Sequence, residues 1–87
     1  MSKTISIGDT LYDVFEGIIE PQKVKEIVQT AEGKMFVTVG QMTEMTIPET
    51  AIGKDVFLDY PAACEYCRAQ YGRVQTIVQN TPGDGDF

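Results

Sequence analysis

The sequence predicts a mainly β fold with one helix near the C-terminus, and three observations support this. Short segments of alternating or β-branched residues follow one another, Gly and Pro turns separate them, and a single later segment has helix start and stop signals. The chain has 87 residues, which is enough for one hydrophobic core. We therefore expect one small, partly open barrel of about five strands, with a possible sixth strand after the helix.

The N-terminal half contains four predicted strands. Residues 11–15 form the first, and residues 18–28 form a long second strand that contains Pro21. Because proline cannot donate to a ladder, we expect an edge position or a bulge at Pro21. Residues 34–39 have the strongest strand signal, since β-branched and aromatic side chains dominate there. Residues 43–47 alternate as their hairpin partner should.

The next part of the chain contains a helical turn, a short strand and the helix. Proline at the start and glycine at the end of residues 48–53 predict a single helical turn. Residues 55–58 follow as a short strand. A helix is predicted over residues 62–70, because Asp59 can cap its N-terminus and Gly72 provides its stop.

The composition changes after Gly72, which divides the chain into two parts. Residues 1–72 are expected to form the barrel with its helix. Residues 73–79 have strand-like side chains, and residues 80–87 are rich in turn-forming and acidic residues. We expect residues 73–87 to be an extension that contains the possible sixth strand and ends in a flexible acidic tail.

Several motifs carry a resemblance to known proteins, namely IGDTLY at residues 7–12, Ile47-Pro48, IGKDVFL at residues 52–58 and the alanine-containing helix. With these motifs the chain resembles a large class of uncharacterised small SH3-like barrel proteins of Firmicutes and of their phages or mobile elements. The resemblance covers about residues 5–72 and implies the fold, but its motifs are structural and imply no catalytic residue. The chain departs from the pattern at Tyr60-Pro61 and at Cys67, and it continues beyond Gly72.

The charge and hydropathy of the chain make two classes of partner improbable. Seven Lys and Arg against thirteen Asp and Glu give a net charge of -6, which opposes binding to phosphate backbones and to anionic membranes. No apolar run approaches the roughly 20 residues that span a bilayer, and Met1-Ser2-Lys3-Thr4 does not resemble the start of a signal peptide. We expect a cytoplasmic protein that binds neither nucleic acid nor membrane.

Few residues are suited to catalysis or to metal binding. The chain has no histidine, the commonest general base, and its carboxylates are scattered. Cys64 and Cys67 have the C-x-x-C spacing of thiol oxidoreductases and of half a zinc site, but Cys64 lies about one turn inside the helix and no third cysteine exists. We expect Cys67 to pack as a small apolar residue with Cys64 beside it. No catalytic residue, metal or cofactor is predicted.

The leading functional hypothesis is a non-enzymatic protein-binding module, such as an accessory or inhibitor protein of a phage or mobile element. Tyr12 and Tyr60 are candidate surface residues, because tyrosine combines a rigid ring with a polar tip. Val74, Thr76 and Val78 are candidates on an exposed strand edge that pairs with a partner chain or with a second copy. Two alternatives remain: an acidic mimic of nucleic acid that inhibits a DNA- or RNA-binding enzyme, and a thiol redox or metal-binding protein that uses Cys64 and Cys67.

Overall fold

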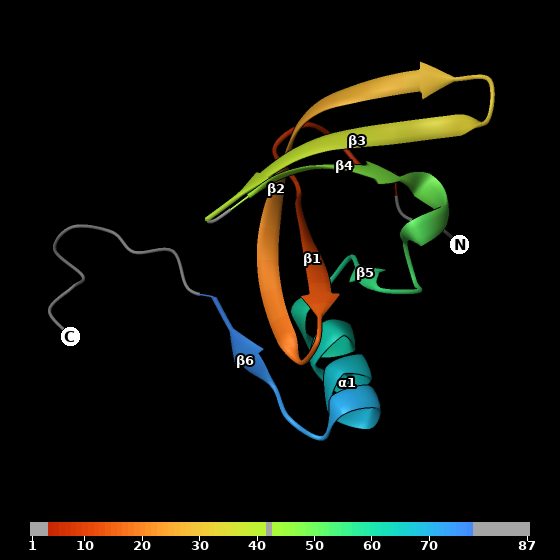
Figure 1. Cartoon of the computed structure of the whole chain (residues 1–87). Coiled ribbons are helices and arrows are strands. Elements are labelled where there is room, and N and C mark those ends of the chain that lie inside the picture. Colours follow the sequence, from red (N-terminus) through yellow and green to blue (C-terminus); the bar gives the residue numbers. More distant parts are fainter. Residues whose placement is uncertain (1–3, 42, 78–87) are drawn as a thin grey trace, which may run out of the picture.

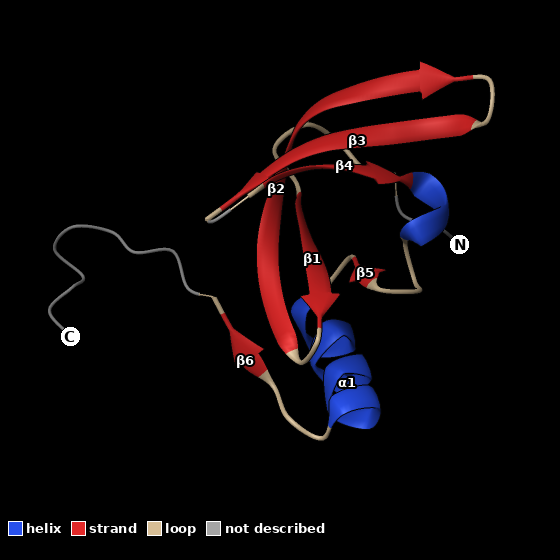
Figure 2. Cartoon of the chain, viewed as in Figure 1, coloured by secondary structure: helices blue, strands red, loops and turns tan. Residues whose placement is uncertain are grey.

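The computed structural model describes residues 4–41 and 43–77 and shows one sheet with one α-helix at its side (Figures 1 and 2). The elements in chain order are β1 (Thr10–Phe15), β2 (Ile18–Thr30), β3 (Gly33–Gly40), β4 (Glu44–Pro48), the 3₁₀ turn η1 (Glu49–Ala51), β5 (Val56–Phe57), α1 (Tyr60–Tyr71) and β6 (Gln75–Thr76). The predicted mainly β class, the C-terminal helix and the sixth strand after it are confirmed.

The sheet is an open antiparallel meander to which β6 adds in parallel. Its strand order is β4-β3-β2-β1-β5, and β6 pairs with β2. In the described part of the chain no ladder joins β4 to β5, so the sheet does not close. This agrees with the prediction that the sheet is only partly open. Figure 1 shows β2 curving from the end beside α1 towards a hairpin with β3 that projects from the body.

The bulge in β2 lies at Lys25 and not at Pro21. The register between β2 and β3 shifts between Val24 and Glu26, so one residue of β2 is left over. This extra residue lets Val24 and Ile27 share the inner face although they are three positions apart, which strict alternation forbids. The bulge therefore keeps the apolar side of β2 against the core while the strand bends.

Pro21 has the local edge position that was predicted for it. The carbonyls of Gly17 and Ile19 point away from β1, where they accept the N–H groups of Gln75 (3.0 Å) and Ile77 (2.9 Å) of the β6 segment. By the two-residue period of a strand, the nitrogen of Pro21 points to the same side. Pairing with β3 starts only at Gln22, so Pro21 lies between the two ladders.

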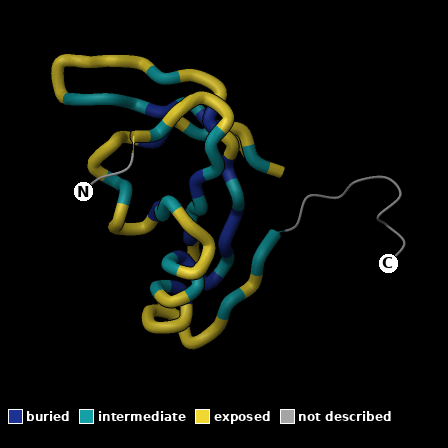
Figure 3. The backbone as a smooth tube through the Cα atoms, turned by 180° about the vertical axis from the view of Figure 1, so that it is seen from behind, coloured by how far each residue is buried: buried dark blue, intermediate teal, exposed yellow. Residues whose placement is uncertain are grey.

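Two apolar clusters cover the opposite faces of β1 and β2. The first, which the curled sheet encloses, consists of Leu11, Val24, Phe36, Ile47 and Val56. The second lies between the sheet and α1 and consists of Val14, Ile19, Ala63 and Cys67. Figure 3 shows buried residues along β1 and the first half of β2, whereas the tip of the β2–β3 hairpin is exposed. The body of the protein is therefore built around β1 and β2.

The helix α1 has the caps that the sequence indicates. Asp59 Oδ1 accepts the N–H of Ala62 at 2.8 Å, and Pro61 lies in the first turn. Gly72 ends the helix in the left-handed region (φ 72°) and donates its N–H to the Arg68 carbonyl. Within the described residues, no helix combines the length and the apolar character that a membrane crossing needs.

A polar cluster joins the buried residues Glu20, Gln22 and Thr38 to the exposed Thr43. The Thr38 hydroxyl donates to Gln22 Oε1 (2.6 Å), Gln22 Nε2 donates to Thr43 Oγ1 (3.3 Å), and the Thr43 hydroxyl donates to Glu20 Oε1 (3.3 Å). Gly40 lies opposite Gln22, and a side chain there would collide with the ends of Gln22 and Glu20. Glycine at this position therefore makes room for the cluster.

Candidate functional site

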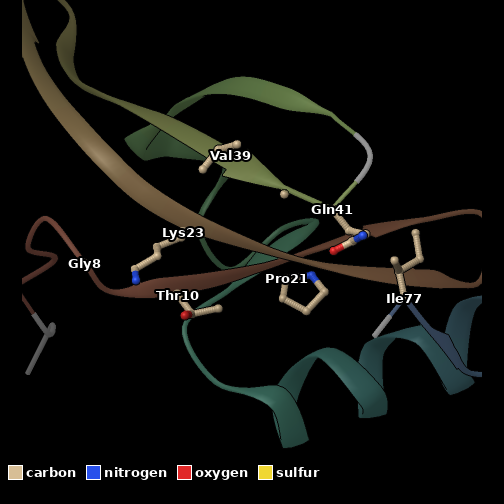
Figure 4. Close-up of a pocket in the computed structure, with 8 residues that line it drawn as sticks. Gly8, Thr10, Pro21, Lys23, Val39, Gln41 and Ile77 are labelled. Atoms are coloured by element: carbon tan, nitrogen blue, oxygen red, sulfur yellow. The ribbon is translucent and has the colours of Figure 1, made fainter. Parts of the chain in front are cut away.

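A groove of about 420 Å³ opens on the face of the sheet that carries α1, in the part that the helix leaves uncovered (Figure 4). Its lining comes from the turn before β1 and the start of β1, the middle of β2, the end of β3, the residue after β3 and the residue after β6. It consists of Gly8, Thr10, Pro21, Lys23, Val39, Gly40, Gln41 and Ile77. This volume is in the range of small-ligand and side-chain sites.

The groove exists because β6 and β3 lie end to end along the same side of β2. β6 is hydrogen-bonded as far as Ile77, whose N–H donates to Ile19. The next bond of a parallel ladder would need an N–H from Pro21, which has none. Since β3 starts to pair with β2 only at Gln22, a gap remains beside Pro21. The groove is formed at this gap.

The lining of the groove combines apolar side chains with one charged group. Thr10, Lys23 and Val39 form a row across three strands, and Val39 is 43% exposed. Figure 4 shows Lys23 near Thr10 at one end, and Ile77 and Gln41 near Pro21 at the other. The eight lining residues include no cysteine and no carboxylate. The groove is therefore suited to hold an apolar group and an anion.

Three of the residues predicted for the functional surface lie together at the border of this groove. The rings of Tyr12 and Tyr60 meet edge to face, with centroids 5.8 Å apart, and the Tyr60 hydroxyl lies 2.7 Å from Thr76 Oγ1. Tyr12 pairs with Pro21 in the sheet, and Thr76 precedes Ile77. Tyr60 thus links the start of α1 to β6 while the residue remains 39% exposed.

The other two predicted residues have different positions. The Val74 side chain is half-buried and packs against the second apolar cluster, so it anchors the segment before β6. Val78 lies outside the described residues. Of the strand edge predicted after the helix, the described residues contain the short strand β6 (Gln75–Thr76), which pairs with β2 on one side.

No family model, curated protein or solved structure matches this chain. The resemblance to SH3-like proteins of Firmicutes and their phages therefore stays a prediction. A function has to be inferred from the groove, from β6 and from the chemistry of the residues around them.

The two cysteines lie on the side of α1 that faces the sheet. Cys67 is buried against the second apolar cluster, and its thiol donates to the Arg73 carbonyl at 3.1 Å. Cys64 is half-buried and packs against the same cluster. The predicted packing of both residues is confirmed. Among the described residues, no group of three or more His, Cys, Asp or Glu is arranged to hold a metal ion.

The raised pKa of the Asp13 carboxyl group was not predicted from the sequence. Asp13 on β1 faces Glu20 on β2 across the ladder. Burial, together with the negative charges of Asp55 and Glu20, raises the pKa of Asp13 from its ordinary 3.8 to about 6. At neutral pH the fold therefore holds a carboxylate in an environment that favours its protonated form.

Asp13→Asn is expected to raise the free energy of unfolding at pH 7 by about 1 kcal/mol, a value that allows for solvent screening of a half-buried group. Because the folded-state pKa is raised, protonation of Asp13 stabilises the fold below about pH 4, and this stabilisation disappears as the pH rises through 6. Urea titrations at pH 3.5 and 7.5 check this. The gain should be absent at pH 3.5, and Glu32→Gln at the exposed hairpin tip should produce no gain at either pH.

Proposed function

We propose that this chain is a non-enzymatic protein-interaction module that binds an extended segment of a partner protein along the outer edge of β6. The observation that carries the proposal is that β6 ends beside an open groove and is hydrogen-bonded to β2 on one side. The resemblance found in the sequence supports a role as an accessory or inhibitor protein of a phage or mobile element, acting in the cytoplasm.

The backbone of β6 is oriented for strand addition. Gln75 and Ile77 donate their N–H groups to β2, so the N–H and C=O of Thr76, between them, point to the opposite side. Partner segments that add to a sheet edge bind through such outward backbone groups. Strand addition at β6 therefore depends on the N–H of Thr76.

The position of β6 is fixed by side chains that do not belong to its outer edge. Thr76 contacts the Tyr60 hydroxyl, and Val74 packs between α1 and the sheet. The Arg73 guanidinium donates to the Glu16 carbonyl at 3.2 Å. A fixed edge loses less conformational entropy when a partner strand adds, which favours binding.

A proline scan of β6 tests the proposal. Thr76→Pro removes the outward N–H and leaves both inner bonds of Gln75 and Ile77 in place, whereas Thr76→Ala removes only the side-chain contact with Tyr60. A bacterial lysate is passed over the immobilised wild type and both variants, and bound proteins are identified by mass spectrometry. We expect a partner that binds the wild type and Thr76→Ala but is lost with Thr76→Pro.

Two further measurements complete the test. Thr76→Pro should melt cooperatively near the wild-type temperature, while Gln75→Pro, which breaks the bond to Gly17, should melt lower. Sedimentation of the wild type and of Thr76→Pro shows whether the captured partner is a second copy. Equal capture of the same partners by all three proteins would contradict binding at the β6 edge.

A further inference from the structure

We infer that the groove beside β6 selects partner segments in which an aliphatic side chain lies two positions from a single Asp or Glu. The inference rests on the proposed function, because it names the chemistry of the segment that adds to β6. Two features of the groove support it: an apolar wall, and one cation that has no ion-pair partner among the described residues. The spacing of two positions follows from the alternation of side chains along an extended segment.

The apolar wall consists of Pro21, Val39 and Ile77, which come from three different strands or strand ends. Val39 remains 43% exposed, and Ile77 is half-buried although it directly follows the last residue of the sheet. Exposed apolar surface inside a concavity is typical of a site that receives an apolar group. An aliphatic side chain suits this groove, because three of its lining residues are apolar.

The cation is Lys23, which lies between Thr10 and Val39 in the row across the strands. The next residue of that row on β4 is Glu44, but its carboxylate is paired with Lys25, the bulge residue. Lys23 forms no ion pair with any described residue. The charge of Lys23 is thus available to a carboxylate that enters the groove.

The overall charge of the protein limits how acidic the bound segment is. The net charge of -6 repels an acidic run at long range, and salt screens this repulsion beyond about 10 Å. Attraction by Lys23 acts only locally, at the distance of a hydrogen bond or an ion pair. A segment with one carboxylate gains the local contact without a large long-range penalty.

The spacing of two positions follows from strand geometry. A segment paired with Thr76 would lie about 4.8 Å from β6. Since Ile77, the residue after Thr76, lines the groove, we expect the next residues of the segment to reach it. Alternate side chains of an extended segment point to the same face. The aliphatic group and the carboxylate both have to reach the face that carries Pro21 and Lys23. Because Pro21 and Lys23 are themselves two positions apart on β2, we expect one residue between the two groups of the segment.

Peptide display on the full-length chain tests this inference. Random heptapeptides are selected on the wild type and on Lys23→Glu, and the enriched peptides are compared. We expect an aliphatic residue two positions from Asp or Glu with the wild type, and Lys or Arg at that acidic position with Lys23→Glu. For one enriched acidic peptide, Lys23→Glu should weaken binding about tenfold. Lys54→Glu, the same charge change at an exposed turn, should leave the affinity unchanged.

The outcomes separate this inference from the proposal for β6. If Thr76→Pro abolishes peptide binding while Lys23→Glu changes neither consensus nor affinity, strand addition stands and the assigned chemistry of the groove is wrong. If Lys23→Glu changes the preferred residue from acidic to basic but Thr76→Pro binds the peptide normally, the groove binds peptides without strand addition at β6, and the proposal for β6 is wrong. A single-stranded oligonucleotide that binds the wild type more tightly than the peptide, and that Lys23→Glu releases, would overturn the inference in favour of a nucleic-acid ligand. A selection that enriches no peptide would overturn both.

Discussion

Phe36→Ala should lower the free energy of unfolding by about 3–5 kcal/mol, which is most of the stability of a typical small domain. Phe36 is 1% exposed and lies on β3 in the first apolar cluster, where Leu11 and Ile47 surround it. Alanine removes the ring and leaves a cavity that the sheet cannot fill, since both neighbouring strands are fixed by their ladders. Urea unfolding followed by far-UV circular dichroism measures the loss.

Phe15→Ala is the matched control for this change. Phe15 ends β1 and is 65% exposed, so the same substitution removes little buried surface. We expect its effect on the free energy of unfolding to stay within about 0.5 kcal/mol. Equal losses for Phe15→Ala and Phe36→Ala would show that the first apolar cluster does not hold the sheet together as described.

Gln22→Ala should cost about 2–3 kcal/mol of unfolding free energy, although the residue is polar. Gln22 is fully buried on the central strand, accepts from Thr38 and donates to Thr43. Alanine leaves the buried Thr38 hydroxyl without this acceptor, and the desolvation of that group is then uncompensated. The same urea experiment measures the effect.

Gln29→Ala, on the exposed part of the same strand, is the control and should change stability by less than about 0.5 kcal/mol. A double-mutant cycle with Thr38→Val isolates the contribution of the hydrogen bond. Since Thr38→Val removes the hydroxyl, Gln22→Ala should cost less in its presence than in the wild type. Additive losses would contradict the coupling of these two side chains.

The order and type of the elements could be predicted from the sequence because local signals agree with the tertiary structure. The helix illustrates this: Asp59 caps it, Gly72 ends it, and its observed bounds, Tyr60–Tyr71, lie within two residues of the prediction. An edge position or a bulge was expected at Pro21, and the structure shows a local edge, since Pro21 pairs with β1 on one side while pairing with β3 starts at Gln22. The bulge at Lys25 was not predictable, because it depends on the register with β3.

The burial of polar residues was harder to predict from the sequence. Gln22, Thr38 and Glu20 have polar side chains that a sequence pattern assigns to the surface, yet all three are buried. Thr38 donates to Gln22, and Glu20 accepts from Thr43. Conversely, Phe15 is a large apolar residue, yet it lies at the end of β1 with most of its surface exposed. Which strand ends are covered depends on where the helix packs, and no local pattern encodes that.

The candidate site could be predicted only in part. Tyr12, Tyr60 and Thr76 were named from residue type, and the structure brings them together. The groove itself was missed, since it arises from a gap between two strands that are far apart in the sequence. Nothing in the sequence indicated a binding role for Lys23, because a single lysine in a strand usually lies on a solvated face.

The parallel pairing of β6 with β2 has a consequence for the order in which the chain folds. β1 to β4 pair with their sequence neighbours, so they are able to form from local hairpins. In the described chain, the pairs between β2 and β6 join residues that are further apart in the sequence than those of any other strand pair. Because loop closure of this length is entropically costly, we expect β6 to dock late and to detach early, together with the helix that carries it. The proposed binding edge is thus the last part of the protein to be completed, and an occupied edge would protect the whole C-terminal unit from local unfolding.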